Sequence, residues 1–490
     1  MKKRILALLL AATMALGMVA CGGKTDDNQG TVNSGSENAG EQGSENAGAS
    51  VYSNFTVPEG GYDGSEVTIT FYNTMGANLK TVLDLYIAEF NELYPNIHIE
   101  TTQVGNYDDV REQISTEITV GNQPNIAYCY PDHVALYNMA KAVATLDDLI
   151  ASDIEVTRAD GTTEILGLTE EQKNDFIAGY YNEGMQFGDG LMYTMPLSKS
   201  TEVLYYNKTF FDANGLTPPT TWDEMEALCK RIKELDPDCI PLGYDSEANW
   251  FITMCEQYGS PYTSATGDRF QFNNDTNKAF VKRFRDWYQK GYVTTQELFG
   301  AYTSGLFTEL DPKEQRCYMC IGSTGGAKHQ VPSPDAGQTG FTVDIKPIPQ
   351  VNPSNPKVIS QGPSLCIFGK ENPQEVIASW LFVKFLTTNV DFQAEFSMVS
   401  GYAPVIKSVS SLEGYTNYLN SSNNIIALAT KVCLQQENAY YTSPAFNGSS
   451  MARDEVGNLM QKCFTATTND VDGFINQAFI DAVDECEYNS

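Results

Sequence analysis

Histidine and basic side chains are scarce in this chain of 490 residues. It has three histidines, His98, His133 and His329, and 31 Lys and Arg against 62 Asp and Glu, for a formal net charge of −31. Nucleic-acid binding needs clustered basic side chains that neutralise phosphates, so we expect no nucleic-acid partner and no attraction to an anionic membrane surface. We interpret the acidity as a source of solubility in a secreted protein.

Sequence motifs of catalysis and of metal binding are also missing. The chain has no HExxH or GxSxG motif, and three histidines provide little acid–base chemistry. The one CxxC pair, Cys317 and Cys320, lies in an alternating strand-like segment, which predicts thiols on opposite faces, and no second pair follows at zinc spacing. We therefore expect no catalytic residue, no metal and no cofactor, and we expect most of the 11 cysteines to be small buried apolar side chains.

The N-terminus has the form of a secretion signal. Lys2, Lys3 and Arg4 precede an apolar run over residues 5–20, which ends just before Cys21. The sequence Met-Val-Ala-Cys-Gly at 18–22 resembles a lipobox, which implies cleavage after residue 20 and a lipid on Cys21 that attaches the protein to the outside of the cell membrane. An uncleaved anchor is the alternative, although the run is shorter than the roughly 20 residues of a membrane span.

A low-complexity segment follows over residues 21–62. It consists mainly of Gly, Ser, Asn, Glu and Ala, and the hexapeptide at 35–40 is repeated at 43–48. Such a composition cannot bury a core, so we expect a flexible tether between the lipid and the folded body.

The rest of the chain alternates between strand and helix patterns. Residues 67–71 alternate between apolar and polar side chains, apolar residues recur at helical spacing from 79 to 93, and residues 97–99 alternate again. This order predicts a βαβ unit, hence a parallel sheet with helices on its faces. A second such region begins after residue 200, where Thr221 and Glu224 have the form of a capping box. The length favours two α/β lobes, and the last hundred residues are mainly helical.

Five stretches of this body carry a family resemblance. The sequences LYYNKTFF at 204–211 and NGLTPPTTWDE at 214–224 resemble a signature of bacterial extracellular solute-binding proteins of the maltose-binding and glycerol-3-phosphate-binding type. Three further stretches, at 319–325, 380–386 and 400–405, resemble elements of the same family in the family's order. The resemblance covers residues from about 65 to 490.

This resemblance implies a fold and a function. The fold is a two-lobed, periplasmic-binding-protein-like α/β fold (type II), in which crossing hinge segments join the lobes and ligand is held between them. The first lobe would comprise 63–198 and 361–404, the second 199–360 and 405–490, with crossings near 194–201, 360–364 and 402–406. The function would be that of a monomeric, non-enzymatic receptor that delivers a sugar or oligosaccharide to the membrane permease of an ABC importer.

Candidate ligand contacts follow from strand ends and from the resemblance. Ligands of open α/β sheets lie beyond the carboxyl ends of strands, and sugars need aromatic faces together with polar side chains. The resemblance adds an aromatic residue in the second lobe, the tyrosine of the stretch at 400–405 and an aromatic before the helix that carries Arg453. The candidates are Asn73, Thr74, Tyr130 and Asp132 in the first lobe, Asn249, Trp250, Ser323 and Thr324 in the second, and Tyr402 and Phe446.

The ligand class stays open at this point. Residues 443–447 lack the arginine that the resemblance implies for glycerol-phosphate binders, which favours a neutral sugar. We interpret Arg453 as a salt-bridging structural residue, with a ligand contact as the alternative. A binding protein for a phosphate ester, polyamine or peptide would share the fold. An extracellular carbohydrate-active enzyme is the other alternative, because 62 acidic residues always offer a pair of carboxylates.

Overall fold

The computed structural model describes residues 54–333, 340–421 and 424–489. The expected signal, Cys21 and the tether as far as residue 53 lie outside these ranges. Within them, no helix combines the length and the hydropathy that a membrane crossing requires.

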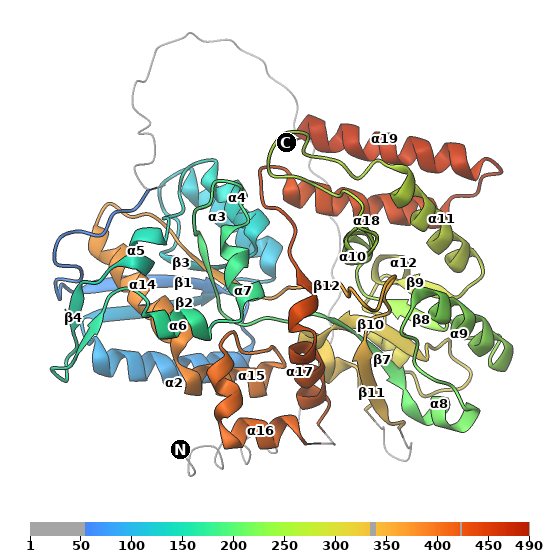
Figure 1. Cartoon of the computed structure of the whole chain (residues 1–490), viewed down its shortest axis with the longest axis horizontal. Helices are drawn as coiled ribbons and strands as arrows, with labels where there is room; N and C mark the ends of the chain where they lie inside the picture. Colours follow the sequence, from blue (N-terminus) through green and yellow to red (C-terminus); the bar gives the residue numbers. More distant parts are fainter. Residues whose placement is uncertain (1–53, 334–339, 422–423, 490) are drawn as a thin grey trace, which may run out of the picture. The chain divides into compact units, whose positions relative to one another are not determined.

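The first lobe is built on a five-stranded sheet in the order β2-β1-β3-β13-β6 (Figure 1). β1 runs parallel to β2 and β3, whereas β13 is antiparallel to both β3 and β6. The predicted βαβ unit is present as β1, α2 and β2. The strands are β1 (Val67–Asn73), β2 (Ile97–Gln103), β3 (Ile126–Cys129), β6 (Thr194–Pro196) and β13 (Ser364–Ile367).

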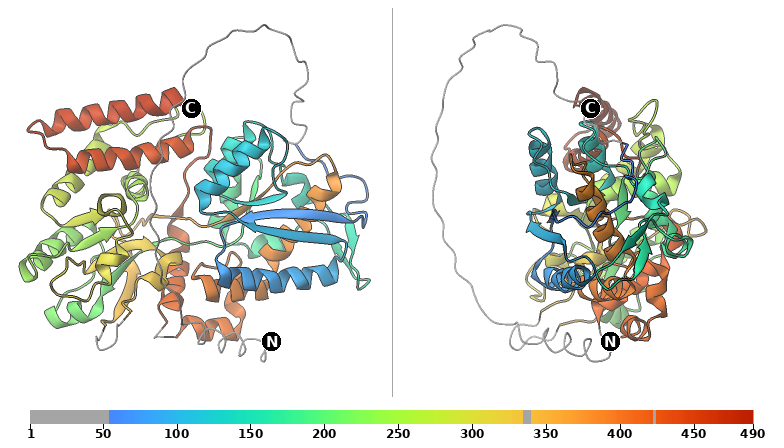
Figure 2. Two further views of the ribbon diagram at one scale, coloured as in Figure 1. Left: turned by 180° about the vertical axis from the view of Figure 1, so that it is seen from behind. Right: turned by 90° about the vertical axis from the view of Figure 1, so that its left-hand side faces the viewer.

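Helices cover both faces of this sheet. Successive residues of β3 face opposite sides: Ile126 and Tyr128 pack in the larger core, and Ala127 and Cys129 pack in a smaller one. The larger core contains α2 (Ala77–Leu93), α14 (Pro373–Thr388) and α15 (Val390–Ser400), and the smaller contains α3 (Tyr107–Ile118) and α4 (Pro131–Asn138). Figure 2 shows α2 lying along the strands of this lobe.

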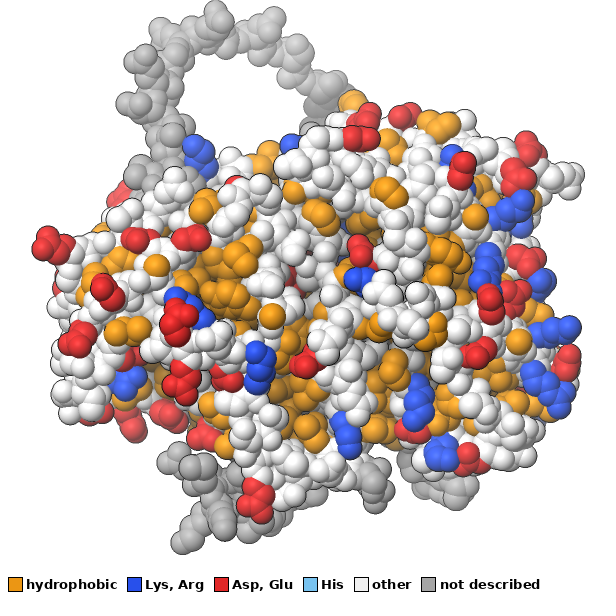
Figure 3. Space-filling model, in the orientation of Figure 1, with side chains coloured by type: hydrophobic (Ala, Val, Ile, Leu, Met, Phe, Trp, Pro, Cys, Tyr) orange, Lys and Arg blue, Asp and Glu red, His pale blue; other side chains and the backbone are white. Residues whose placement is uncertain are grey.

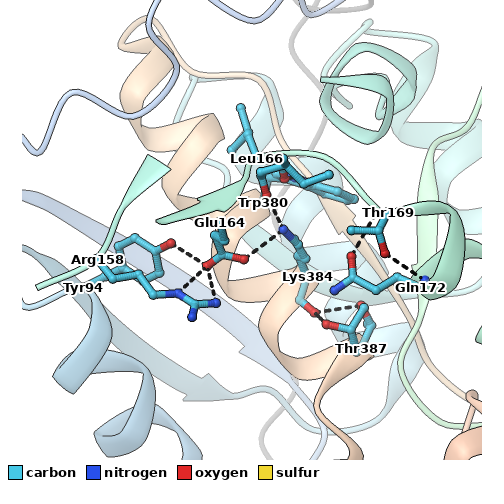
Figure 4. A network of polar contacts seen from close by, with 11 residues as sticks. Tyr94, Arg158, Glu164, Leu166, Thr169, Gln172, Trp380, Lys384 and Thr387 are labelled. Carbon is cyan, nitrogen blue, oxygen red and sulfur yellow. Dashed lines mark hydrogen bonds and ion pairs between the residues drawn. The ribbon is translucent and has the colours of Figure 1, made fainter. Parts of the chain in front are cut away.

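A polar network joins α14 to the edge of the first lobe (Figure 4). The Lys384 ammonium lies 2.9 Å from the Glu164 carboxylate, which also lies 2.9 Å from Arg158 and accepts a hydrogen bond of 2.6 Å from the Tyr94 hydroxyl. Burial alone would raise the pKa of Glu164, but these partners, Lys384 foremost, hold the pKa below its usual value. The network therefore allows a mainly apolar helix to carry a buried charge.

The second lobe has a sheet in the order β11-β7-β10-β8-β9. Its strands are β7 (Glu202–Asn207), β8 (Leu242–Tyr244), β9 (Val293–Thr295), β10 (Met319–Ser323) and β11 (Val343–Pro347). The predicted capping box is confirmed, since Thr221 and Glu224 cap each other's backbone at the start of α9. The covering helices are α9 (Trp222–Leu235), α10 (Glu247–Tyr258), α11 (Asp275–Gln289), α18 (Ser449–Thr465) and α19 (Val471–Asn489).

Shorter elements fill the connections. Two-stranded sheets form from β4 (Glu155–Thr157) with β5 (Thr163–Ile165), and from β12 (Val358–Ile359) with β14 (Tyr440–Tyr441). The short α-helices are α5 (Asp147–Ala151), α6 (Glu170–Asp175), α7 (Ala178–Asn182), α8 (Lys208–Asn214), α12 (Gln296–Phe299), α13 (Ser304–Phe307), α16 (Glu413–Leu419) and α17 (Ile425–Gln435). The 3₁₀ turns are η1 (Glu183–Met185), η2 (Thr324–His329), η3 (Lys407–Ser411) and η4 (Glu437–Ala439).

Three crossing segments lie side by side between the lobes. The backbones of Lys199 and Ala403 bond to each other at 3.1 and 2.6 Å, and those of Ser200 and Gln361 do so at 2.7 and 3.0 Å. These contacts lie within the crossings expected near 194–201, 360–364 and 402–406. Backbone bonds between the segments tie their movements together.

Two stretches pack differently from the expected division of the chain. Residues 405–419 were expected in the second lobe, but Val405, Val409 and Tyr415 pack in the larger core of the first. Residues 54–62 were expected in the tether, but Phe55 and Val57 pack against that same core. In both stretches apolar side chains are removed from water by packing on the first lobe, and this burial is favourable. The composition of the surrounding segment did not indicate it.

The cysteines of the described ranges are all buried and free of disulfides. Cys317 and Cys320 pack in one core together, so the prediction that they lie on opposite faces is wrong. The strand begins only at Met319, and Cys317 precedes it.

Candidate binding site

A cavity of about 140 Å³ lies where both lobes and a crossing segment meet. It is lined by Tyr130, Pro131, Asp132 and Glu183 of the first lobe, by Ile359, Ser360 and Gln361 of the crossing, and by Ile252, Tyr262, Thr263, Thr442, Ser443, Pro444, Ser449 and Arg453 of the second lobe. Most of its polar side chains are hydroxyls and amides, which can both donate and accept hydrogen bonds.

The first-lobe wall is aromatic. Tyr130 immediately precedes α4, and its ring stacks on Tyr107 with centroids 4.5 Å apart. Tyr107 in turn stacks on Tyr128 at 6.2 Å, and the side chains of Thr74 and Tyr402 lie close to it. This arrangement holds flat apolar rings at the edge of the cavity.

The second-lobe wall carries a positive charge. α18 begins after Gly448, whose φ of 98° is open to glycine, and Arg453 lies one turn into the helix. The Arg453 guanidinium donates to the side-chain oxygen of Asn249. Among the described residues no carboxylate lies within ion-pairing distance of it, so our interpretation of Arg453 as a salt-bridging residue is wrong.

Two hydroxyls in the cavity wall have no hydrogen-bond partner within the described ranges. They are the Tyr262 hydroxyl and the Thr263 hydroxyl, and Tyr262 is only 6% exposed. Burial raises the pKa of Tyr262 well above its usual value, so the hydroxyl keeps its proton and can donate. Buried polar atoms are rarely left unpaired, so these two hydroxyls are suited to a bound ligand.

An ion pair joins the wall of the cavity to the crossings. Lys199 and Glu183 are 2.6 Å apart, with side chains 0% and 3% exposed. The Lys199 ammonium also donates to the Ser364 hydroxyl at 2.9 Å, and Ser360 donates to Glu183 at 3.5 Å. The pair thus links the first lobe to two of the crossing segments.

A chain of hydrogen bonds supports Arg453 from behind. Asn249 donates to Glu202 at 2.7 Å and to Gln361 at 3.1 Å, and Tyr244 donates to the other oxygen of Glu202 at 2.6 Å. Burial raises the pKa of Glu202 to about 7, although the bonds from Tyr244 and Asn249 and the charge of Arg453 oppose this shift.

The structure brings some of the sequence candidates to this region. Tyr130 and Asp132 line the cavity, and Asn249 lies one hydrogen bond behind it. Thr74 and Tyr402 lie close to Tyr107, whose ring stacks on Tyr130.

Other candidates have structural contacts. Asn73 accepts a bond from the Met75 backbone, and Ser323 and Thr324 bond to Ser200 and Thr201 of a crossing. These three side chains are engaged within the protein, outside the lining of the cavity.

Trp250 and Phe446 require correction, because both pack in the core of the second lobe. Trp250 is 0% exposed and stacks on Tyr244 at 4.8 Å, while Phe446 packs against Phe270. A strand end and the family resemblance placed Trp250 in the right region, and the resemblance alone placed Phe446 there, but the packing partners of a large ring decide which way it points.

Sequence reasoning missed several lining residues. Tyr262 and Thr263 lie in an irregular stretch after α10, which carries no motif. Glu183 lies in a single 3₁₀ turn, and Ser360 and Gln361 lie in a crossing that the resemblance located without assigning it a role in binding. The crossing itself was the one available signal. In the described part of the chain, no cluster of three or more potential metal ligands is present.

Two mixed sheets with helices on their faces, joined by three paired crossings around a polar and aromatic cavity, define the class of two-lobed binding proteins. The chain belongs to the bacterial extracellular solute-binding protein family, which matches residues 86–420. This is a family of transport receptors without enzymatic activity.

Relatives of known name agree with this membership. The sn-glycerol-3-phosphate-binding periplasmic protein UgpB of Salmonella typhimurium is 24% identical over 375 residues, 72% of this chain and 78% of its own length. The Escherichia coli K12 protein of the same name is 24% identical over 365 residues, 70% of this chain and 76% of its own length.

Solved structures show the same fold. The cyclic α-maltosyl-1,6-maltose binding protein of Arthrobacter globiformis matches with a TM-score of 0.67 at 17% identity, covering 87% of this chain and all of its own. UgpB of Mycobacterium tuberculosis in complex with glycerophosphocholine matches with a TM-score of 0.67 at 17% identity, covering 86% of this chain and 98% of its own. The sugar-binding protein MalE of Xanthomonas citri matches with a TM-score of 0.64 at 16% identity, covering 86% of this chain and 98% of its own.

Proposed function

We propose that this receptor captures a neutral carbohydrate in the cavity between Tyr130 and Arg453 and delivers it to the permease of an ABC importer. The observation that carries the proposal is the composition of the cavity wall. Two tyrosine rings, several hydroxyls and one guanidinium face the same space, from both lobes and a crossing. The apolar face of a sugar ring can pack on an aromatic side chain, and the sugar hydroxyls can bond to the protein hydroxyls and to the guanidinium.

The size of the cavity limits the ligand. Its volume of about 140 Å³ is below the roughly 300–1,000 Å³ of pockets that bury drug-sized molecules. One sugar unit, free or at the end of an oligosaccharide, suits this space. Any further units would extend toward Tyr107, whose ring stacks on the cavity-lining Tyr130.

A phosphate ester is the second candidate, and one observation favours it. Arg453 has no carboxylate partner among the described residues, and an unpaired guanidinium is a good receptor for phosphate oxygens. The relatives named for glycerol-3-phosphate are consistent with it. Asp132 in the same lining would repel an anion, and for this reason the neutral sugar is our first choice.

The location of the protein follows from its N-terminus. The lipid on Cys21 would hold the receptor at the outer surface of the cell membrane, and the following segment would give it reach toward the permease. Residues 54–62 pack on the first lobe, so the proposed tether would be shorter than residues 21–62.

Calorimetric titration with maltose and with glycerol-3-phosphate tests the ligand class. Saturable heat with maltose and none with glycerol-3-phosphate supports the neutral sugar, and the reverse supports the phosphate ester. Analysis of the titrated sugar by chromatography would reveal hydrolysis, which a transport receptor does not perform.

Tyr262→Phe tests the cavity itself. Removing this hydroxyl should weaken sugar binding roughly two- to twelvefold, since one hydrogen bond is worth about 0.5–1.5 kcal/mol. It should not lower the free energy of unfolding, because the hydroxyl has no partner within the described residues. The matched control is Tyr258→Phe, which removes an exposed hydroxyl at the end of α10 and should leave binding unchanged. Equal affinity of both variants would exclude Tyr262 as a ligand contact.

A further inference from the structure

Glu202 is a buried carboxylate with neutral hydrogen-bond partners. It is the first residue of β7 and is 1% exposed. Its two oxygens accept bonds from Tyr244 at 2.6 Å and from Asn249 at 2.7 Å. Within the described ranges no Lys or Arg forms an ion pair with it, so its charge is balanced only at a distance.

The contacts of Asn249 fix the orientation of its amide. The nitrogen faces two oxygens that can only accept in these contacts, those of Glu202 and of Gln361. The oxygen faces the Arg453 guanidinium, which can only donate. A flipped amide would break all three contacts. Asn249 therefore keeps its NH2 group toward Glu202 and its oxygen toward Arg453.

We propose that Glu202 is a positioning residue that holds the Arg453 guanidinium at the cavity wall through Asn249, so that ligand affinity depends on the charge of Glu202. The proposal rests on the proposed sugar-binding function of this cavity. Glu202 itself does not line the cavity. It acts through the amide, because a charged acceptor strengthens the bond that Asn249 donates and polarises the oxygen that receives Arg453.

The surroundings of Glu202 put its titration in the neutral range. Burial raises its pKa to about 7, against the lowering by Tyr244, Asn249 and Arg453, and Asp245 adds to the rise. The titratable groups that face it are Tyr244 and Asp245 beside β8, Tyr441 of β14 and Arg453 of α18.

The direction of the pH effect follows from these contacts. If Arg453 holds a neutral sugar best when Glu202 is ionised, sugar binding favours the ionised form of Glu202. Binding then lowers the pKa of Glu202 from its value of about 7 in the ligand-free protein and releases a proton. Affinity is then fully present above that pKa and decreases as the pH falls through it. The loss should be roughly three- to tenfold, the difference between a charge-assisted and a neutral hydrogen bond.

The test is maltose titration of the whole purified chain between about pH 6 and about pH 8, in wild type and Glu202→Gln. Glutamine keeps the shape and cannot ionise; its oxygen can still accept from Asn249, while its amide nitrogen, which only donates, would donate to the Tyr244 hydroxyl instead of accepting from it. We expect the variant to bind weakly, with little dependence on pH, while wild type gains affinity toward pH 8. The control is Glu247→Gln, another buried carboxylate with a raised pKa, located in α10 and outside this chain of bonds. It should keep the wild-type profile.

Two results would overturn the proposal. One is a Glu202→Gln variant with the wild-type pH profile, and the other is wild-type affinity that rises as the pH falls. A second readout needs no ligand: the guanidinium nitrogen signal of Arg453, assigned by its loss in Arg453→Lys, should titrate near pH 7 in wild type and stay constant in Glu202→Gln. A wild-type signal that does not titrate would also reject the proposal. Absence of maltose binding together with a titrating signal would reject the sugar and keep the role of Glu202.

Discussion

At the residue scale, the ion pair of Lys199 and Glu183 differs from the exposed ion pairs of this protein in its burial. Both side chains are nearly removed from solvent, and the ammonium has three hydrogen-bond partners, Glu183, Ser364 and the Gly362 carbonyl. A buried pair is not a strong source of stability in itself, since both charges lose their hydration. Removal of one partner is a different matter, because the other charge then remains buried and unpaired.

Lys199→Met should therefore lower the free energy of unfolding by about 3–5 kcal/mol. Lys208→Met is the matched control, since Lys208 pairs with Asp212 at the same 2.6 Å but with side chains 41% and 65% exposed. Screening by solvent makes such a surface pair weak, so the control should change stability little. Urea unfolding monitored by tryptophan fluorescence measures the free energy of unfolding of both variants. Similar stability of the two variants would show that Glu183 is compensated by other groups.

At the scale of elements, the short turn η2 meets the crossing that carries Tyr402. A Cβ atom placed on Gly325 would lie 2.9 Å from the Tyr402 ring, closer than side chains approach each other. The neighbouring Gly326 has no atom within 4 Å of the same position. Glycine at 325 thus allows the turn and the ring to pack directly against each other.

Gly325→Ala should displace the Tyr402 ring and weaken sugar binding, by roughly threefold if one contact of about 0.7 kcal/mol is lost. Gly326→Ala adds the same methyl group to the same turn without a clash, so its affinity should equal that of wild type. Calorimetric titration with maltose compares the two variants. An unchanged affinity in Gly325→Ala would argue against Tyr402 as a ligand contact.

At the scale of the whole molecule, acidic residues outnumber basic ones, with 62 Asp and Glu against 31 Lys and Arg. On the face in Figure 3, Lys and Arg lie among Asp and Glu. With an excess of 31 negative charges, attraction to an anionic membrane is weak, so the proposed retention at the membrane would depend on the N-terminus.

Cys21→Ser tests this retention. The variant should lose incorporation of labelled palmitate and appear in the medium or periplasm instead of the membrane fraction, because no acyl chain remains to hold it. Cys486→Ser is a control, since Cys486 is buried in α19 and offers no exposed thiol for acylation. Membrane retention of Cys21→Ser would favour an uncleaved anchor over residues 5–20.

Much of the fold was predictable because its signals are local. The alternation in β1, the helical spacing in α2 and the capping box before α9 depend on residues within a few positions of one another. Each of these elements is present. The boundary at residue 404 was less secure, because the packing of Val409 and Tyr415 on the first lobe depends on contacts with distant residues.

The sequence by itself determined the family, the α/β class and two lining residues, Tyr130 and Asp132, because strand ends and family motifs can be identified along the chain. Only the tertiary structure decided that Tyr262 and Arg453 meet these residues, that Trp250 turns into the core, and that Glu202 supports Arg453 through Asn249. These residues are far apart in sequence. Their convergence depends on how the lobes pack and on which polar atoms that packing leaves unpaired, and neither has a local signal.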